Sequence, residues 1–188
     1  MLYLFLKRLF DILMSIFVLI FLSPILILIS LLIFFQDRKS VIFKQKRFGL
    51  NGGKFTFYKF RSMPVLTPNV TSDMKSKIKI TPFGKILRRT NMDELPQFFN
   101  ILKGDMSVIG PRPAILSQKN LIFLRKTNGS INIKPGLTGW AQVNSYDDMT
   151  ESSKAQYDGE YFKDMSIGLD LLIIFKTIIY FTKKPPTY

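Results

Sequence analysis

The sequence contains no cysteine and no histidine among its 188 residues. These absences exclude disulfides, thiolate zinc sites, thiol nucleophiles, imidazole bases and histidine-based metal centres. Acidic residues are also scarce, because 13 Asp and Glu stand against 27 Lys and Arg, and the formal net charge is +14. Any chemistry must therefore use carboxylates, lysines, arginines and the backbone. The positive excess points to a phosphate-bearing partner, which could be nucleic acid, anionic lipid or a phosphorylated substrate.

A long apolar run lies near the N-terminus, from Leu9 to Phe35. As a straight helix it would measure roughly 40 Å at about 1.5 Å per residue, which exceeds a hydrocarbon core of about 30 Å. Pro24 removes a backbone donor near the middle of the run, so a kink is predicted there, with the Ser23 hydroxyl able to bond the released carbonyl. Asp11 inside the run also argues against a plain crossing helix.

Basic residues flank this run on both sides and resist translocation of either end. They are Lys7 and Arg8 before it, and Arg38, Lys39, Lys44, Lys46 and Arg47 after it. We therefore predict that residues 1–37 form a re-entrant membrane helix, broken at Ser23–Pro24, which enters and leaves by the cytoplasmic face. An uncleaved signal anchor that crosses the membrane once is the alternative from these residues alone.

The predicted fold class is α/β, mostly helical with a small β-hairpin, and the cytoplasmic catalytic domain is assigned to residues 38–165. Residues 39–49 and 52–63 have the composition of two short strands joined by a Leu-Asn-Gly-Gly turn. Residues 64–80 are polar and poorly periodic, which is typical of a surface loop. Thr81–Pro82 should open a short helix, because Thr caps helices and Pro suits their first position.

Nucleic acid is not expected as a partner. The stretch GGKFTFYKF resembles an aromatic RNA-binding strand, but the chain offers one strand of that type behind an apolar anchor. Anionic membrane lipid accounts better for the positive charge.

The C-terminal segment, residues 166–188, is predicted to be an interfacial amphipathic helix and tail. Its apolar part has about 15 residues, whereas a crossing helix needs about 20. Asp170 and Lys176 interrupt this part, and two lysines follow it. We expect the helix to lie flat among lipid headgroups with its lysines toward anionic lipid. A buried helix of the globular core is the alternative.

A carboxylate pair, Asp93–Glu94, precedes another predicted helix, which Gly104 ends. An apolar stripe at helical spacing should pack this helix against a core. The stripe consists of Leu95, Phe98, Phe99 and Leu102. The pair then lies at or just before the first turn, where acidic groups complement the helix dipole. Thr90 and Asp93 have the spacing of a capping box, as do Asn91 and Glu94, so a purely structural role is one alternative.

Several cations surround the pair in the sequence and favour a chemical role instead. They are Lys59, Arg88, Arg89 and Arg112. Each can donate charge-assisted hydrogen bonds to phosphate oxygens. A carboxylate in this setting is ionised and can attack phosphorus once cations reduce the repulsion between anions. The metal expected here is Mg²⁺, with Asp93 and Glu94 as ligands, because this ion is held by one or two carboxylates plus substrate phosphates.

Long motifs resemble those of the bacterial sugar transferases, the monotopic phosphoglycosyl transferases. They are RTNMDELPQFFNILKGDMSVIGPRP, with QKRFG and FYKFRSM before it and IKPGLTGWAQVN after it. The motifs recur in the right order, and the resemblance runs from Lys7 through the C-terminal helix. At this length the chain is similar to a PglC-type minimal catalytic core.

This resemblance implies that a phosphosugar moves from a UDP-sugar to polyprenol (undecaprenyl) phosphate, with release of UMP, at the first membrane step of glycan assembly. It implies that Asp93 attacks the β-phosphate and forms an aspartyl phosphosugar. Glu94 would hold Mg²⁺ and assist the acceptor as a base, while Lys59 and Arg112 would lie near the phosphates. We add Arg88 on the basis of its charge and proximity. Downstream glycosyltransferases would be further partners.

The resemblance also implies a re-entrant helix broken at Ser23–Pro24. The location it implies is the cytoplasmic face of the bacterial inner membrane. The sequence departs from the family pattern at Phe48 and at the pair Ser145–Tyr146. The departure at the pair leaves the identity of the donor sugar undetermined. A catalytically silent scaffold that binds anionic lipid is the alternative from a different functional class.

Overall fold

The computed structural model of the chain describes residues 1–64, 80–144 and 149–182. The helices are α1 (Leu2–Phe21), α2 (Ser23–Asp37), α3 (Pro82–Arg89), α4 (Gln97–Lys103), α5 (Lys119–Thr127), α6 (Trp140–Asn144), α7 (Glu151–Asp164) and α8 (Ile167–Thr182). The strands are β1 (Ile42–Phe48), β2 (Lys54–Phe60), β3 (Ser107–Ile109) and β4 (Gly136–Thr138), and three 3₁₀ turns are η1 (Leu50–Gly52), η3 (Met92–Glu94) and η4 (Ser130–Asn132). This is the mostly helical α/β fold that was expected. Most of the loop predicted at 64–80 lies outside the described residues.

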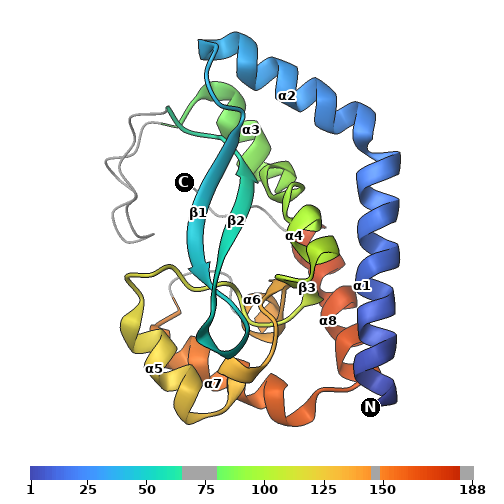
Figure 1. Cartoon of the computed structure of the whole chain (residues 1–188), viewed down its shortest axis with the longest axis vertical. Helices are drawn as coiled ribbons and strands as arrows, with labels where there is room; N and C mark the ends of the chain where they lie inside the picture. Colours follow the sequence, from blue (N-terminus) through green and yellow to red (C-terminus); the bar gives the residue numbers. More distant parts are fainter. Residues whose placement is uncertain (65–79, 145–148, 183–188) are drawn as a thin grey trace.

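The N-terminal apolar run forms two helices that meet at an angle of 62° (Figure 1). Pro24 cannot donate to the carbonyl of Ile20, and the Ser23 hydroxyl donates to that oxygen instead at 2.7 Å. The break expected at Ser23–Pro24 is therefore present. Among the described residues, no single helix is long and apolar enough to span a membrane, whereas α1 and α2 together have that length and composition.

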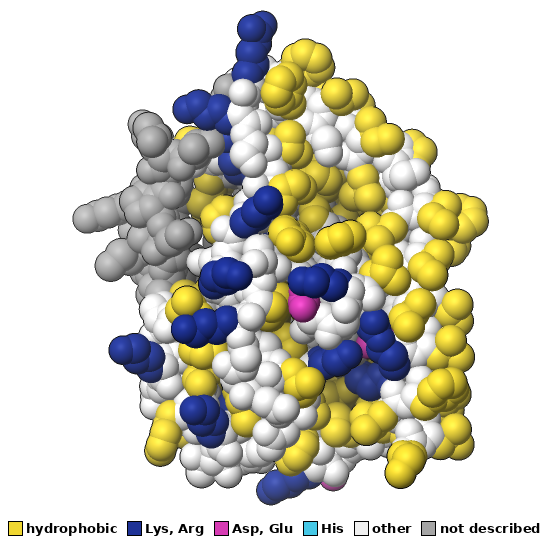
Figure 2. Space-filling view, viewed as in Figure 1, with side chains coloured by type: hydrophobic (Ala, Val, Ile, Leu, Met, Phe, Trp, Pro, Cys, Tyr) yellow, Lys and Arg dark blue, Asp and Glu magenta, His cyan; other side chains and the backbone are white. Residues whose placement is uncertain are grey.

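All three charged side chains of α1 bind the rest of the protein. Lys7 pairs with Asp170 of α8 at 2.8 Å, and Arg8 donates to two carbonyls at the end of α4 at 2.7 and 2.8 Å. The Asp11 carboxylate accepts hydrogen bonds from the Val108 N–H at 2.8 Å and from a serine hydroxyl of β3. The charges of α1 thus face inward, and its outward side is lined by exposed apolar side chains, which are yellow in the space-filling view (Figure 2).

The second helix of the pair packs on the same body. Ile29 and Ile33 of α2 are buried in a cluster with Phe60 of β2 and Leu87 of α3. Figure 1 shows α1 and α2 as an arc around one side of the molecule. Both halves of the bent pair therefore rest against the elements that follow them in the chain.

The β-hairpin has the predicted strands and turn. β1 and β2 pair antiparallel, from Ile42 opposite Phe60 to Phe48 opposite Lys54. A second sheet, the parallel pair of β3 and β4, was not predicted, because three-residue strands are too short to show a period in the sequence. The hairpin and the helices around it enclose the main core, to which Phe57, Ile101 and Ile173 contribute.

The apolar stripe predicted on α4 is partly wrong. Phe98 and Ile101 are buried, but Phe99 is 54% exposed and lies edge-on against the ring of Tyr58. The helix begins only at Gln97, and the preceding 3₁₀ turn changes the angular spacing of the residues before it. The buried face is consequently rotated away from Phe99.

The C-terminal helix α8 has one buried and one exposed face. Ile173 is fully buried in the main core, while Leu171, Phe175 and Ile178 are exposed. The lysines of this segment were expected to point toward anionic lipid, but the Lys176 ammonium points inward, where it donates to Asn144 and lies 4.4 Å from the centre of the Trp140 ring. The lysines at 183 and 184 lie outside the described residues.

Candidate active site

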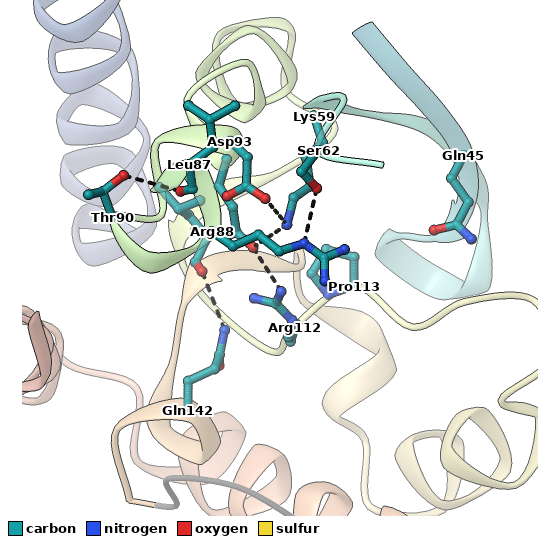
Figure 3. Close-up of polar contacts among 12 residues, drawn as sticks. Gln45, Lys59, Ser62, Leu87, Arg88, Thr90, Asp93, Arg112, Pro113 and Gln142 are labelled. Atoms are coloured by element: carbon teal, nitrogen blue, oxygen red, sulfur yellow. Dashed lines mark hydrogen bonds and ion pairs between the residues drawn. The ribbon is translucent and has the colours of Figure 1, made fainter. Parts of the chain in front are cut away.

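Four charged side chains from three separate segments meet at η3 (Figure 3). Lys59 Nζ of β2 lies 2.8 Å from Asp93 Oδ2 and 3.4 Å from Glu94 Oε1. Arg112, in the loop after β3, places Nη2 at 2.9 Å from the same Glu94 oxygen. The carboxylate pair predicted as catalytic is therefore bound to two of the three cations predicted to hold phosphate.

The capping role considered for the pair does not occur in the structure. The η3 turn has no side-chain cap, and the residue just before it, Asn91, has a φ of 52°. Asparagine tolerates this left-handed conformation better than most residues. The Thr90 hydroxyl turns back and donates to the carbonyls of Ile86 and Leu87. The carboxylates of the pair are consequently left for Lys59 and Arg112.

The two carboxylates have opposite electrostatic settings. Burial raises the pKa of Asp93, which is 1% exposed; Lys59 opposes that rise and the neighbouring Glu94 adds to it. Burial acts in the same direction on Glu94, but Arg112 and Lys59 outweigh it and hold the pKa of Glu94 well below its usual range. Glu94 is thus ionised at neutral pH, whereas the ionisation of Asp93 depends on the balance between burial, which raises its pKa, and Lys59, which lowers it.

The third predicted cation, Arg88, lies beside the pair at the end of α3. It donates from Nε to the Ser62 hydroxyl at 3.0 Å and helps to lower the pKa of Asp93. The close approach of α3 depends on Gly84, where an added Cβ would lie 2.0 Å from the Ser62 carbonyl oxygen. Any other residue at position 84 would push Arg88 away from Lys59. Arg89, which was also considered, is exposed.

One cation of the site was missed in the sequence. Arg47 of β1 stacks on the Phe57 ring at 4.2 Å and donates to the carbonyl of Pro113 at 2.8 Å. Burial and the nearby Arg112 lower its pKa to about 10, and Glu94 opposes this. One signal in the sequence could have indicated it. The arginine of the QKRFG motif lies within a predicted strand of a half-buried hairpin, where a charged side chain needs a specific partner.

A second missed residue, Asn100 of α4, fixes the strand that carries Lys59. Its side chain is fully buried, accepts from the N–H of Tyr58 at 3.1 Å and donates to the carbonyl of Thr56 at 2.7 Å. One amide therefore satisfies two backbone groups on the outer edge of β2. No sequence pattern distinguishes this asparagine from one on the surface of a helix.

The site meets part of the requirements for Mg²⁺. Across residues 1–64, 80–144 and 149–182, no three acidic side chains gather into a metal cage. Mg²⁺ does not need one, because it is usually held by one or two carboxylates together with substrate phosphates. Glu94 stays ionised and Asp93 lies beside it, so the two residues fit this ion as an incomplete set of ligands that donor phosphates would complete.

Comparisons with known proteins show the family to which the chain is similar. Residues 2–184 match the model of the family described as bacterial sugar transferase. The chain is 42% identical over 182 residues to UDP-glucose:undecaprenyl-phosphate glucose-1-phosphate transferase of Klebsiella pneumoniae, which covers 92% of this chain and 39% of that protein. It is 37% identical over 173 residues to the uncharacterized sugar transferase EpsL of Bacillus subtilis (strain 168), with 92% and 85% covered.

A further relative carries a different sugar in its name. The chain is 37% identical over 188 residues to UDP-N-acetylgalactosamine-undecaprenyl-phosphate N-acetylgalactosaminephosphotransferase of Aeromonas hydrophila, which covers 94% of this chain and 43% of that protein. The chain thus spans less than half the length of this relative and of the Klebsiella protein.

Proposed function

Because the chain belongs to the bacterial sugar transferase family, we propose that it transfers a phosphosugar from a UDP-sugar to undecaprenyl phosphate and releases UMP, as the first membrane step of glycan assembly. The names of its relatives support this reaction class. The observation that carries the proposal is the environment of Asp93, a buried carboxylate in contact with an ammonium and adjacent to an anion that Arg112 neutralises.

In the first step, a carboxylate oxygen of Asp93 attacks the β-phosphorus of the donor. The bond between that phosphorus and the oxygen bridging to the α-phosphate breaks, UMP leaves with the bond electrons, and a phosphosugar remains on Asp93. Lys59 and Arg112 offset the negative charge that gathers on the transferring group. Arg88 contributes a further positive charge at the same place.

In the second step, a phosphate oxygen of undecaprenyl phosphate attacks the same phosphorus. The aspartyl bond breaks, the carboxylate of Asp93 is restored, and the product is a sugar linked to the lipid through a diphosphate. The base role that the resemblance implies for Glu94 is not favoured, because Arg112 and Lys59 hold its pKa well below its usual range and make it a weak proton acceptor; a metal-ligand role fits this permanently ionised carboxylate better. Bound Mg²⁺ would be held by Glu94 and Asp93 and would supply additional positive charge for the donor diphosphate.

A direct test measures UMP release over a panel of UDP-sugars with undecaprenyl phosphate and Mg²⁺. We expect one donor of the panel to be preferred, and UDP-glucose and UDP-N-acetylgalactosamine belong in it because relatives are named for them. Intact-protein mass spectrometry after mixing with the preferred donor alone should show an added phosphosugar. No adduct, together with kinetics that require both substrates bound at once, would contradict the covalent mechanism.

The pH dependence of UMP release should follow the ionisation of Asp93. Attack needs the carboxylate, and the pKa of Asp93 is raised by burial, so kcat/KM should fall as the pH drops through a value above the usual aspartate range. Glu94 raises this pKa and Lys59 lowers it. The Glu94→Gln variant should therefore move the acid limb to lower pH, and the Lys59→Met variant should move it to higher pH. An acid limb that stays at the same pH in both variants would contradict the assignment of Asp93.

We further propose that α1 and α2 form a monotopic, re-entrant anchor in the bacterial inner membrane, with the catalytic domain on the cytoplasmic face. Support comes from the contacts of both helices with the same body, which leave their apolar outer sides for lipid. Anionic lipids are the natural partners of the surplus positive charge.

Tags at residue 1 and residue 188 test this topology. Both should be protected from a membrane-impermeant label in intact cells and should react after the cells are permeabilised. Labelling of the N-terminal tag alone in intact cells would establish a crossing helix.

A further inference from the structure

Two arginines, the buried Arg125 and the half-buried Arg47, bind the backbone of the loop that carries Arg112. Arg125 of α5 donates from Nη1 to the Arg112 carbonyl at 3.0 Å, and Arg47 donates from Nη1 to the carbonyl of Pro113 at 2.8 Å. Pro111 and Pro113 have no N–H and fix their own φ. Carbonyl oxygens are therefore the main polar groups by which this loop can be held.

Arg125 is held in turn by Asp158 of α7. Its Nε and Nη2 approach one carboxylate oxygen at 2.8 and 2.6 Å, and the residues are only 5% and 1% exposed. The planar guanidinium thus binds the carboxylate on one side and the loop on the other. A lysine ammonium cannot make both contacts with a fixed geometry. Buried ion pairs often add little net stability, so stabilisation of the fold alone is a weak explanation for this pair.

We propose that Arg125 and Asp158 are positioning residues that set the place of the Arg112 guanidinium against Glu94, and through it the binding of the donor diphosphate. The inference rests on the proposed function, since it presumes that Arg112 contacts phosphate. The Arg112 side chain is 49% exposed and pairs with Glu94 at 2.9 Å. A side chain this exposed loses much rotamer freedom when it binds a ligand, and fixing its backbone in advance reduces that loss.

A double-mutant cycle between Asp158 and Arg112 tests the proposal. Asp158→Asn should lower kcat/KM for UMP release by about 10- to 100-fold, mainly through a higher KM for the UDP-sugar. In the Arg112→Ala background the same change should cost less than about threefold, because residues that act through one another are not additive. A purely structural role would give the same factor in both backgrounds, and that result would overturn the proposal.

The Arg125→Lys variant addresses the case in which Asp158→Asn fails to fold. It keeps the buried charge opposite Asp158 but loses the fork that reaches the loop, so KM for the donor should rise while the chain stays folded by circular dichroism. Lys126→Met, an exposed change on the same helix, is the matched control and should leave KM unchanged. A wild-type KM in folded Arg125→Lys would overturn the proposal.

Calorimetric binding of UDP separates this inference from the proposed function, because it needs no turnover. Asp158→Asn should weaken UDP binding in the chain that retains Arg112 and should have little effect in Arg112→Ala. A wild-type chain that binds UDP but releases no UMP with any donor would refute the proposed function and leave the positioning role to be judged by these affinities. A wild-type chain that does not bind UDP would overturn both.

Discussion

Asp93→Asn should abolish UMP release, with kcat/KM lowered by at least about 10⁴-fold, as expected when a nucleophile is removed. The substituted amide keeps the size of the side chain but cannot form a stable acyl phosphate under these conditions. The measurement is UMP release with the preferred donor, together with the search for a phosphosugar adduct by mass spectrometry. Both signals should disappear.

The stability of the same variant provides an internal control. Burial raises the pKa of Asp93 in the folded chain, so the folded state loses stability as the pH rises from the unfolded pKa through the folded pKa, and the cost is complete above the folded pKa. Asparagine carries no such cost, so the Tm of Asp93→Asn should be equal to or above that of the wild type. Asp164→Asn, at an exposed aspartate, should leave both activity and Tm unchanged. Near-normal UMP release by Asp93→Asn would refute the nucleophile assignment.

Asn100→Leu should lower the Tm by about 10 °C. It leaves two buried backbone groups without hydrogen-bond partners, and each unpaired group costs about 1–3 kcal/mol. The groups are the N–H of Tyr58 and the carbonyl of Thr56. Leucine has the same number of side-chain heavy atoms as asparagine and is somewhat bulkier, so the substitution opens no cavity and the loss reports the missing hydrogen bonds together with any overpacking. Since β2 also carries Lys59, kcat/KM should fall as well.

Differential scanning calorimetry in detergent checks this prediction. Asn132→Leu, at an exposed asparagine in η4, is the matched control and should shift the Tm by less than about 2 °C. Equal shifts in the two variants would show that the edge of β2 does not depend on Asn100.

Much of the architecture could be predicted where it depends on interactions between residues that are close in the sequence. The kink at Pro24 follows from a missing donor, and the start of α3 follows from a threonine cap and a proline. The hairpin follows from two aromatic strands around a glycine-containing turn. Each of these features depends on residues within a few positions of one another, so a single sequence contains the necessary information.

The charged residues of the site could be predicted from the sequence, but the residues that hold them in place could not. Asp93, Glu94 and Arg112 stand out as charged groups in long motifs. Arg125 and Asp158 are separated by 33 positions and do not. Their ion pair forms only because α5 packs against α7, and the spacing of the two charges in the sequence does not predict that contact. The exposure of Phe99 was missed for a related reason, since it depends on where the 3₁₀ turn gives way to α4.

The packing of α2 has a practical consequence for anyone who wants this protein without detergent. Ile29 and Ile33 fill the cluster that also contains Phe60 and Leu87, next to the residues that carry Lys59 and Arg88. A truncation that begins after α2 would open this cluster to water directly behind the active site. A usable water-soluble form should instead keep the whole helical arc and exchange only its outward side chains, such as Phe17, Leu28 and Leu31, for polar ones.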